Sequence, residues 1–215
     1  MGFRAFDWNR ARSDFYTYFN DFTAYLAAEW TITTAEVGAG SATEALTNAA
    51  GGNLLITNAA GDDDHDFLQL LGESFAYVSG KKLQFVFRGA LSDAADSDFV
   101  AGLQITDTSP LAVSDGIFMR KDDGDNTLQL VVCKDGTESV ADMGELADAT
   151  AFSAEIYYDG SSDRIEGYLN GSRVCSVALT NAPDDEELTI SFGLQNGAAA
   201  AKTLTVDYIG ASCER

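Results

Sequence analysis

Hydrophobic and polar residues alternate along most of the chain with a period of two, as in strands that bury one face. In segment 82–88, for example, Leu83, Phe85 and Phe87 share one face, and polar or smaller residues share the other. The alternation recurs in segments 99–105, 152–158, 165–169, 188–194 and 204–208. Turn sequences separate such segments, among them 122–126, Asp159-Gly160, Asn170-Gly171 and Asn196-Gly197. We therefore predict about ten to thirteen strands, spaced roughly ten residues apart, in an antiparallel β-sandwich.

Near the N-terminus the pattern is different. Five aromatic residues between positions 14 and 26 recur at helical spacing: Phe15, Tyr18, Phe19, Phe22 and Tyr25. Either a helix of one to three turns or a strand docked on a sheet would bury them. We therefore divide the chain into an N-terminal arm (1–20), ending in this helix or strand, and a sandwich domain (21–215).

The charge balance is strongly acidic: 34 Asp and Glu face 13 Lys and Arg, giving a formal net charge of -21. Such a surface is a poor partner for nucleic acid or an anionic membrane, because both need Lys and Arg. The arm is the exception, since it combines three arginines with three large aromatic residues: Phe3, Arg4, Phe6, Trp8, Arg10 and Arg12. These residue types are enriched at interfaces, so the arm either binds a partner or folds back on its own acidic domain.

The sequence carries few signs of processing. Its first residues lack the apolar core of a secretion signal, and no stretch approaches about 18 consecutive apolar residues. Three widely spaced cysteines, Cys133, Cys175 and Cys213, predict free thiols made in a reducing cytosol. A disulfide between Cys133 and Cys175 is the alternative.

One acidic run is a candidate metal site. It contains the single histidine, His65, together with the calcium candidates Asp62, Asp64 and Asp66. The spacing does not match an EF-hand loop, and a solvated acidic loop is the favoured explanation of the run, with calcium binding as the alternative. The acids at 122–125 resemble calcium ligands too, but a hairpin turn accounts for them.

Known catalytic patterns are missing from the sequence. A Ser-His-Asp or Cys-His site would have to use His65, and there is no GxSxG motif, zinc-ligand spacing or phosphate-binding loop. A glycosidase needs two carboxyl groups on one face, but the i+2 neighbours of Glu155 and Glu166 are Tyr157 and Tyr168. We therefore predict that the protein is not an enzyme and needs no cofactor, calcium excepted.

Several longer stretches together resemble virion structural proteins of tailed bacteriophages that have a concanavalin A-like jelly-roll sandwich. They include FNDFTAYLAAEWTIT near the start, the hairpin DRIEGYLNGSRV, and LTISFGLQNGAAAAKTLTVDYI near the end. The resemblance covers roughly residues 20–210, and the hairpin is common to many lectin-like sandwiches. It implies a non-enzymatic decoration, cement or head-fibre protein on the capsid exterior, made in the host cytoplasm. Its partners would be the major capsid protein and further copies of itself, as a dimer or trimer.

A lectin-like carbohydrate-binding module is the alternative function. Sugar-binding grooves combine aromatic side chains with a few polar groups that fix orientation. Tyr157 and Tyr168 are the candidates, because their neighbours Ile156 and Leu169 are expected to point inward. They would equally serve to cover a sheet face or an oligomer contact.

Overall fold

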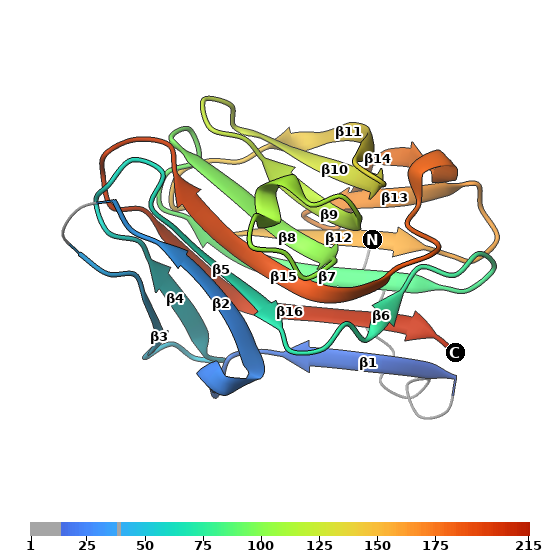
Figure 1. Ribbon diagram of the computed structural model, residues 1–215, viewed down its shortest axis with the longest axis horizontal. Helices are drawn as coiled ribbons and strands as arrows, with labels where there is room; N and C mark the ends of the chain where they lie inside the picture. The colour runs from blue at the N-terminus through green and yellow to red at the C-terminus, as the bar shows by residue number, and fades with distance from the viewer. Residues whose placement is uncertain (1–13, 38–39) are drawn as a thin grey trace.

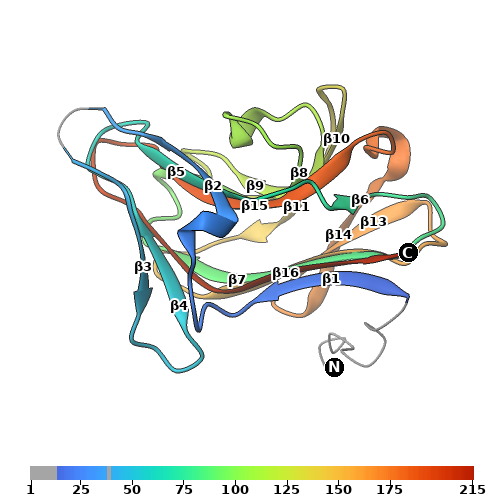
Figure 2. The ribbon, with the colours of Figure 1, turned by 60° about the horizontal axis from the view of Figure 1, so that its bottom comes forward.

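The computed structural model describes residues 14–37 and 40–215. In these residues, sixteen strands form two antiparallel sheets that stack face to face (Figure 1, Figure 2). The predicted all-β antiparallel sandwich is therefore confirmed. There are more strands than the sequence pattern predicts, because several short edge strands carry little alternation of their own.

Sheet 1 is built around the long C-terminal strand. Its spatial order is β14 (Ser172–Ala178), β13 (Arg164–Leu169), β12 (Phe152–Tyr158), β7 (Leu83–Leu91), β16 (Thr203–Glu214), β4 (Asn53–Thr57) and β3 (Thr43–Thr47), and β1 (Phe15–Asn20) also pairs with β16. Hairpins join β12 to β14 and β3 to β4, whereas β16 pairs with strands from distant parts of the chain, β1, β4 and β7, as in a jelly roll.

Sheet 2 contains the remaining strands. Its order is β11 (Thr137–Glu145), β10 (Thr127–Lys134), β9 (Gly116–Lys121), β8 (Ser97–Gln104), β15 (Glu187–Asn196), β5 (His65–Leu70) and β2 (Trp30–Ala35), and β6 (Phe75–Ala76) also pairs with β15. Three single-turn 3-10 helices lie in connections: η1 (Ala27–Glu29), η2 (Pro110–Ala112) and η3 (Leu179–Asn181).

The main hydrophobic core lies between the two sheets. Strand β7 shows how the sequence builds it, because its residues alternate strictly between buried and half-buried positions. Phe87 of β7 contacts Phe99 of β8, with ring centroids 5.3 Å apart, and Phe152 of β12 packs on both. The inward half of each strand thus supplies the core, as the alternation predicts.

The aromatic stretch near the N-terminus forms strand β1 and not a helix. Tyr16 and Tyr18 point inward opposite Cys213 and Ala211 of β16, while Phe19 lies on the outer face and stacks on Tyr208 at 5.8 Å. Aromatic residues on both faces of a strand imitate helical spacing in the sequence. Pairing with β16 decides the outcome, because it satisfies the backbone groups of both strands.

The three cysteines are free thiols, and Cys133 and Cys175 are not joined. Burial raises the pKa of Cys175 and of Cys213 to about 11. Both thiols are therefore protonated and poorly nucleophilic at neutral pH. Within the described ranges, we find no helix long and apolar enough to span a membrane.

Candidate functional site

The outer face of sheet 1 gathers aromatic and charged side chains over strands β7, β12 and β13. On β12, Phe152, Ala154 and Ile156 point into the core. The alternation therefore turns Glu155 and Tyr157 outward, where both are half-buried. On β13, Ile165 points inward, and Glu166 and Tyr168 consequently share the same outer face.

The register between β12 and β13 arranges these four residues as alternating pairs. Glu155 lies opposite Tyr168, and Tyr157 lies opposite Glu166. The two tyrosines are therefore diagonal neighbours, as are the two glutamates, at a typical Cα separation of about 7–8 Å. We call Glu155, Tyr157, Glu166 and Tyr168 the tyrosine–glutamate face.

Hydrogen bonds and ion pairs hold the carboxylates of this face in place. Tyr168 Oη donates to Glu166 Oε2 at 2.6 Å, and the Arg173 guanidinium lies 3.1 Å from Glu166 Oε1. On the other side, Gln84 Nε2 donates to Glu155 Oε1 at 2.8 Å. The carboxylate orientations are thus set before any ligand arrives.

A second ion pair continues the polar surface toward β16. Arg88 of β7 lies opposite Ser153 of β12 and Tyr208 of β16, and its Nε is 2.8 Å from Asp207 Oδ2. Burial is the main cause of the raised pKa of Tyr208, so its hydroxyl stays a hydrogen-bond donor at neutral pH. The outer face of sheet 1 therefore offers ring surfaces, carboxylate acceptors and guanidinium donors.

The structure confirms that Tyr157 and Tyr168 point outward, but it adds partners that the sequence search missed. That search looked for carboxyl groups at i and i+2 along one strand. The pairing runs across strands instead, because Glu155 and Tyr168 are separated by a hairpin and meet only through register. The Asn170-Gly171 turn marks β13 and β14 as a hairpin, whereas no local pattern identifies Gln84 or Arg173 as members of the face.

The outer face of sheet 2 is covered by the chain itself. Val100, Phe118 and Val131 point away from the main core, yet they are fully buried. They form a second hydrophobic cluster with Ile105 and Leu111, from the connection that carries η2 (Figure 2). This connection, residues 105–115, is called the covering segment below.

Buried glutamines fasten the covering segment. Gln69 Nε2 donates to the Ile105 carbonyl at 3.1 Å, and Gln69 Oε1 accepts from the Asp107 amide at 3.1 Å. Gln104 Nε2 donates to the Pro110 carbonyl at 2.9 Å. The central part of this outer face is therefore occupied by protein and closed to a ligand.

The three calcium candidates do not converge on one point. Asp62 is exposed, whereas Asp64 and Asp66 are fully buried. Asp64 accepts hydrogen bonds from the backbone amides of Val37 and Gly61, which lower its pKa. The described residues contain no group of three or more His, Cys, Asp or Glu side chains that could hold a metal ion.

The ammonium group of a lysine side chain lies against the acidic hairpin turn that follows β9. Lys121 is fully buried, and its Nζ donates to the carbonyl oxygens of Asp122 and Asp125, each at 3.0 Å. Asp125 also accepts from the Thr127 amide and hydroxyl, as a turn residue does. The interpretation of these acids as a hairpin turn fits this geometry without a metal.

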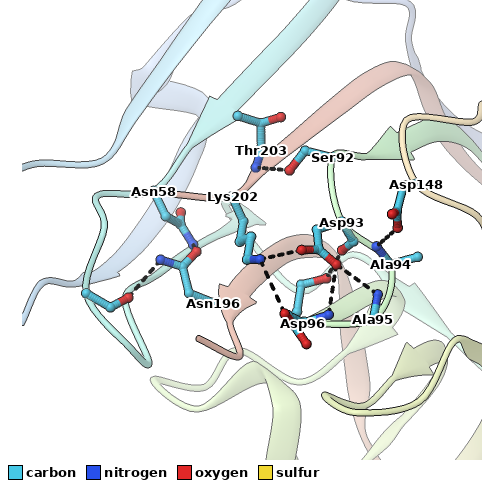
Figure 3. Close-up of polar contacts among 12 residues, drawn as sticks. Asn58, Ser92, Asp93, Ala94, Ala95, Asp96, Asp148, Asn196, Lys202 and Thr203 are labelled. Carbon is cyan, nitrogen blue, oxygen red and sulfur yellow. Dashed lines mark hydrogen bonds and ion pairs between the residues drawn. The ribbon is translucent and has the colours of Figure 1, made fainter. Parts of the chain in front are cut away.

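Figure 3 shows a buried polar network where several loops meet at one end of the sandwich. Lys202 contacts the carboxylates of Asp93 and Asp96, and Asp93 Oδ1 also accepts from two backbone amides of its own loop. Nearby, Asn196 Nδ2 donates to the carbonyls of Ala59 and Gly61 at 2.7 and 2.8 Å. Asp93 and Asn196 bond to the backbone of their neighbouring loops, so the network positions these loops.

The predicted partner-binding residues of the arm, Phe3, Arg4, Phe6, Trp8, Arg10 and Arg12, lie outside the described residues. Their role stays a prediction.

Comparison with solved structures identifies the type of fold. No protein-family model and no curated protein matches the sequence. Among solved structures, an endo-1,3-beta-glucanase from Streptomyces sioyaensis is similar, with a TM-score of 0.62 and 14% identity over 94% of this chain and 97% of that one. The carbohydrate recognition domain of Emp47p is similar too, with a TM-score of 0.63 and 14% identity over 93% and 97% of the two chains. The sandwich is therefore of the concanavalin A-like, lectin-like type.

These similarities correct one sequence-based prediction. We predicted that the protein is not an enzyme, but the structures that share its fold include a glucanase. The prediction is wrong because it treated the absence of familiar motifs as the absence of catalysis.

Metal binding also occurs in this fold. A potassium-bound form of the Emp46p carbohydrate recognition domain is similar to this chain, with a TM-score of 0.60 and 7% identity over 89% and 94% of the two chains. Calcium binding by the present protein stays a prediction.

Proposed function

We propose that this protein binds carbohydrate through the tyrosine–glutamate face of sheet 1. The observation that supports the proposal most strongly is the cross-strand pairing of Glu155 with Tyr168 and of Tyr157 with Glu166. Two diagonal rings offer apolar surfaces to the C–H groups of a sugar, and the carboxylates accept hydrogen bonds from its hydroxyls.

The rest of the molecule supports the same location. The middle of the outer face of sheet 2 is filled by the covering segment, whereas sheet 1 presents its polar and aromatic groups outward. Arg173 and Gln84 fix the two glutamates, so little side-chain entropy is lost on binding. Carbohydrate-recognition domains and glucanases of this fold support the proposal at the level of architecture.

Replacing Tyr168 by alanine tests the proposal directly. The purified protein is screened by native affinity electrophoresis against soluble neutral polysaccharides, and the retarding polysaccharide is then titrated by calorimetry. Tyr168→Ala should weaken binding by about tenfold or more, because it removes one of two aromatic anchors. Tyr168→Phe, which keeps the ring and removes the hydroxyl that bonds to Glu166, should keep most of the affinity.

Val140→Ala, a change on an exposed residue of sheet 2, is the matched control and should bind like the parent protein. Unchanged binding by a folded Tyr168→Ala variant would remove this face from the proposal. The chain length of the bound polysaccharide is measured before and after incubation, and shortening would show that the face also cleaves its ligand.

The capsid role rests on the sequence resemblance alone. It implies the major capsid protein as a partner and a place on the virion exterior, and both stay predictions. Co-sedimentation with purified particles tests them, and deletion of residues 1–12 tests the arm separately from the tyrosine–glutamate face.

A further inference from the structure

Two carboxyl groups meet between the sheets at the edge formed by β2 and β3. Asp66 of β5 is fully buried and lies on the same face of its strand as the core residue Leu68. Glu44 of β3 is paired with the core residue Ile56 of β4, so it points inward from sheet 1. The two side chains approach within hydrogen-bonding range across the interior.

The surroundings contain further acids and no nearby positive charge from this half of the chain. Glu36 follows β2, contacts the Asp64 carboxylate and adds its charge to the field at Asp66. No Lys or Arg occurs between Ser13 and Gly80. His65 lies on the opposite face of β5, with its ring 5.2 Å from Phe67.

Several buried oxygen atoms in this group have no hydrogen-bond donor within the described structure. Thr34 Oγ1 donates to Asp66 Oδ1, but Asp66 Oδ2 has no donor. Both Glu36 carboxylate oxygens and the Tyr25 hydroxyl are also buried without a hydrogen-bond partner among the described residues. Ionised carboxylates only accept hydrogen bonds, so an Asp66–Glu44 contact lacks a donor unless one group carries a proton.

We propose that a single proton, shared by Asp66 of β5 and Glu44 of β3, joins the two sheets at this edge and makes the edge pH-sensitive. With the proton present, one carboxyl group donates to the other, and the buried oxygen of Asp66 is satisfied. When the proton leaves, two carboxylates repel each other in a poorly solvated place. The edge strand β3 and the segment around Tyr25 then lose their attachment to β5.

The electrostatics support this direction. Burial, followed by the contact with Glu44, raises the pKa of Asp66 to about 7. Burial and the charges of Glu44 and Asp66 raise the pKa of Tyr25 as well, so its hydroxyl stays neutral. Asp64 remains ionised, because backbone amides lower its pKa. The group that titrates near neutral pH is therefore Asp66, which is in contact with Glu44.

The sign of the pH effect follows from linkage. The folded protein holds a proton at Asp66 up to about pH 7, whereas the unfolded chain releases it near pH 4. Across this window the unfolded state binds fewer protons, so the free energy of unfolding falls as pH rises. The loss is complete above the folded pKa.

Urea denaturation of the full chain at pH 5.5 and at pH 8 tests the proposal. The parent protein is compared with the variants Asp66→Asn and Glu44→Gln. The amide of Asp66→Asn supplies a donor at every pH. For each protein, the unfolding equilibrium constant at pH 8 is divided by its value at pH 5.5. We expect this ratio to be about tenfold larger for the parent than for Asp66→Asn. Glu145→Gln, a change on an exposed glutamate of β11, should retain the parent's pH dependence.

Hydrogen exchange at the two pH values locates the effect and does not require a stable Asp66 variant. Exchange rates are first divided by the intrinsic rates, which are much faster at pH 8. The protection factors of β3 and of residues 21–29 in the parent should then fall between pH 5.5 and pH 8, and Glu44→Gln should suppress the fall. The proposal would be overturned if the stability of the parent and of Asp66→Asn depended on pH in the same way, and if the change in hydrogen exchange were uniform along the chain. Rescue of the parent at pH 8 by 1 mM calcium chloride but not by sodium chloride would also overturn it, because this result would assign the site to a metal ion.

Discussion

The ammonium group of Lys202 is an example of how single residues fix loops in this protein. It is 5% exposed and bonds to the carboxylate of Asp93, which also accepts from the Ala95 and Asp96 amides (Figure 3). The Asp96 amide, followed by Lys202 and then by the Ala95 amide, lowers the pKa of Asp93. The stabilisation that Asp93 provides is therefore present above its ordinary pKa and is lost as pH falls through the lowered value.

Lys202→Met should lower the free energy of unfolding at pH 7 by about 2 kcal/mol. Breaking a fully buried ion pair costs roughly 3–5 kcal/mol. We expect less here because Asp93 keeps its amide donors and some contact with water. Urea denaturation measures the change. Lys82→Met, on a half-buried lysine at the other end of the domain, is the control and should have a much smaller effect. Equal stability of Lys202→Met and the parent would show that the pair contributes nothing.

At the scale of elements, the covering segment 105–115 distinguishes the two outer faces. Its Ile105 and Leu111 close over Phe118 and Val131, and Gln69 and Gln104 bond to its backbone. Of the two outer faces, only that of sheet 1 is consequently open at its centre.

Gln69→Leu should release the covering segment while β5 stays in the sheet. The fully buried Gln69 amide bonds to Ile105, Asp107 and Ser191, and its loss should cost about 2 kcal/mol of stability. Hydrogen exchange of residues 105–115 should accelerate in this variant. Gln129→Leu, on a half-buried glutamine that bonds to the exposed Asp142, should leave the exchange unchanged. If residues 105–115 exchanged at the same rate in both variants, the covering segment would be held by the hydrophobic cluster alone.

The whole molecule carries a formal net charge of -21, and under the proposed function that charge would affect which carbohydrates bind to the tyrosine–glutamate face. Two arginines on the outer face of sheet 1 are already paired with carboxylates, Arg88 with Asp207 and Arg173 with Glu166, and Arg164 donates to the Ser176 hydroxyl. A neutral glycan meets no electrostatic barrier at such a surface, whereas a polyuronate is repelled by it.

A neutral polysaccharide that binds should therefore outcompete its uronic-acid counterpart, and the difference should shrink at high ionic strength, because salt screens the repulsion. Competition in the calorimetric assay at 20 and 500 mM sodium chloride measures both effects. Preferential binding of the polyuronate at low salt would contradict the assignment of a neutral ligand.

Much of this organisation follows from the sequence itself. The alternation in segments such as 83–91 and 152–158 determines strands, an inward apolar half and hence a sandwich, because a period of two is a local property of each segment. The outward direction of Tyr157 and Tyr168 follows from the same rule.

Only the tertiary structure decided the rest. Pairing with β16 made residues 15–20 a strand, and register placed Glu155 opposite Tyr168 and diagonal to Gln84, with which it forms a hydrogen bond. The covering of sheet 2 and the meeting of Glu44 with Asp66 likewise join segments far apart in the chain. The physical reason is that strand order and register depend on the free energy of long-range pairing and burial, which no local pattern of residues records.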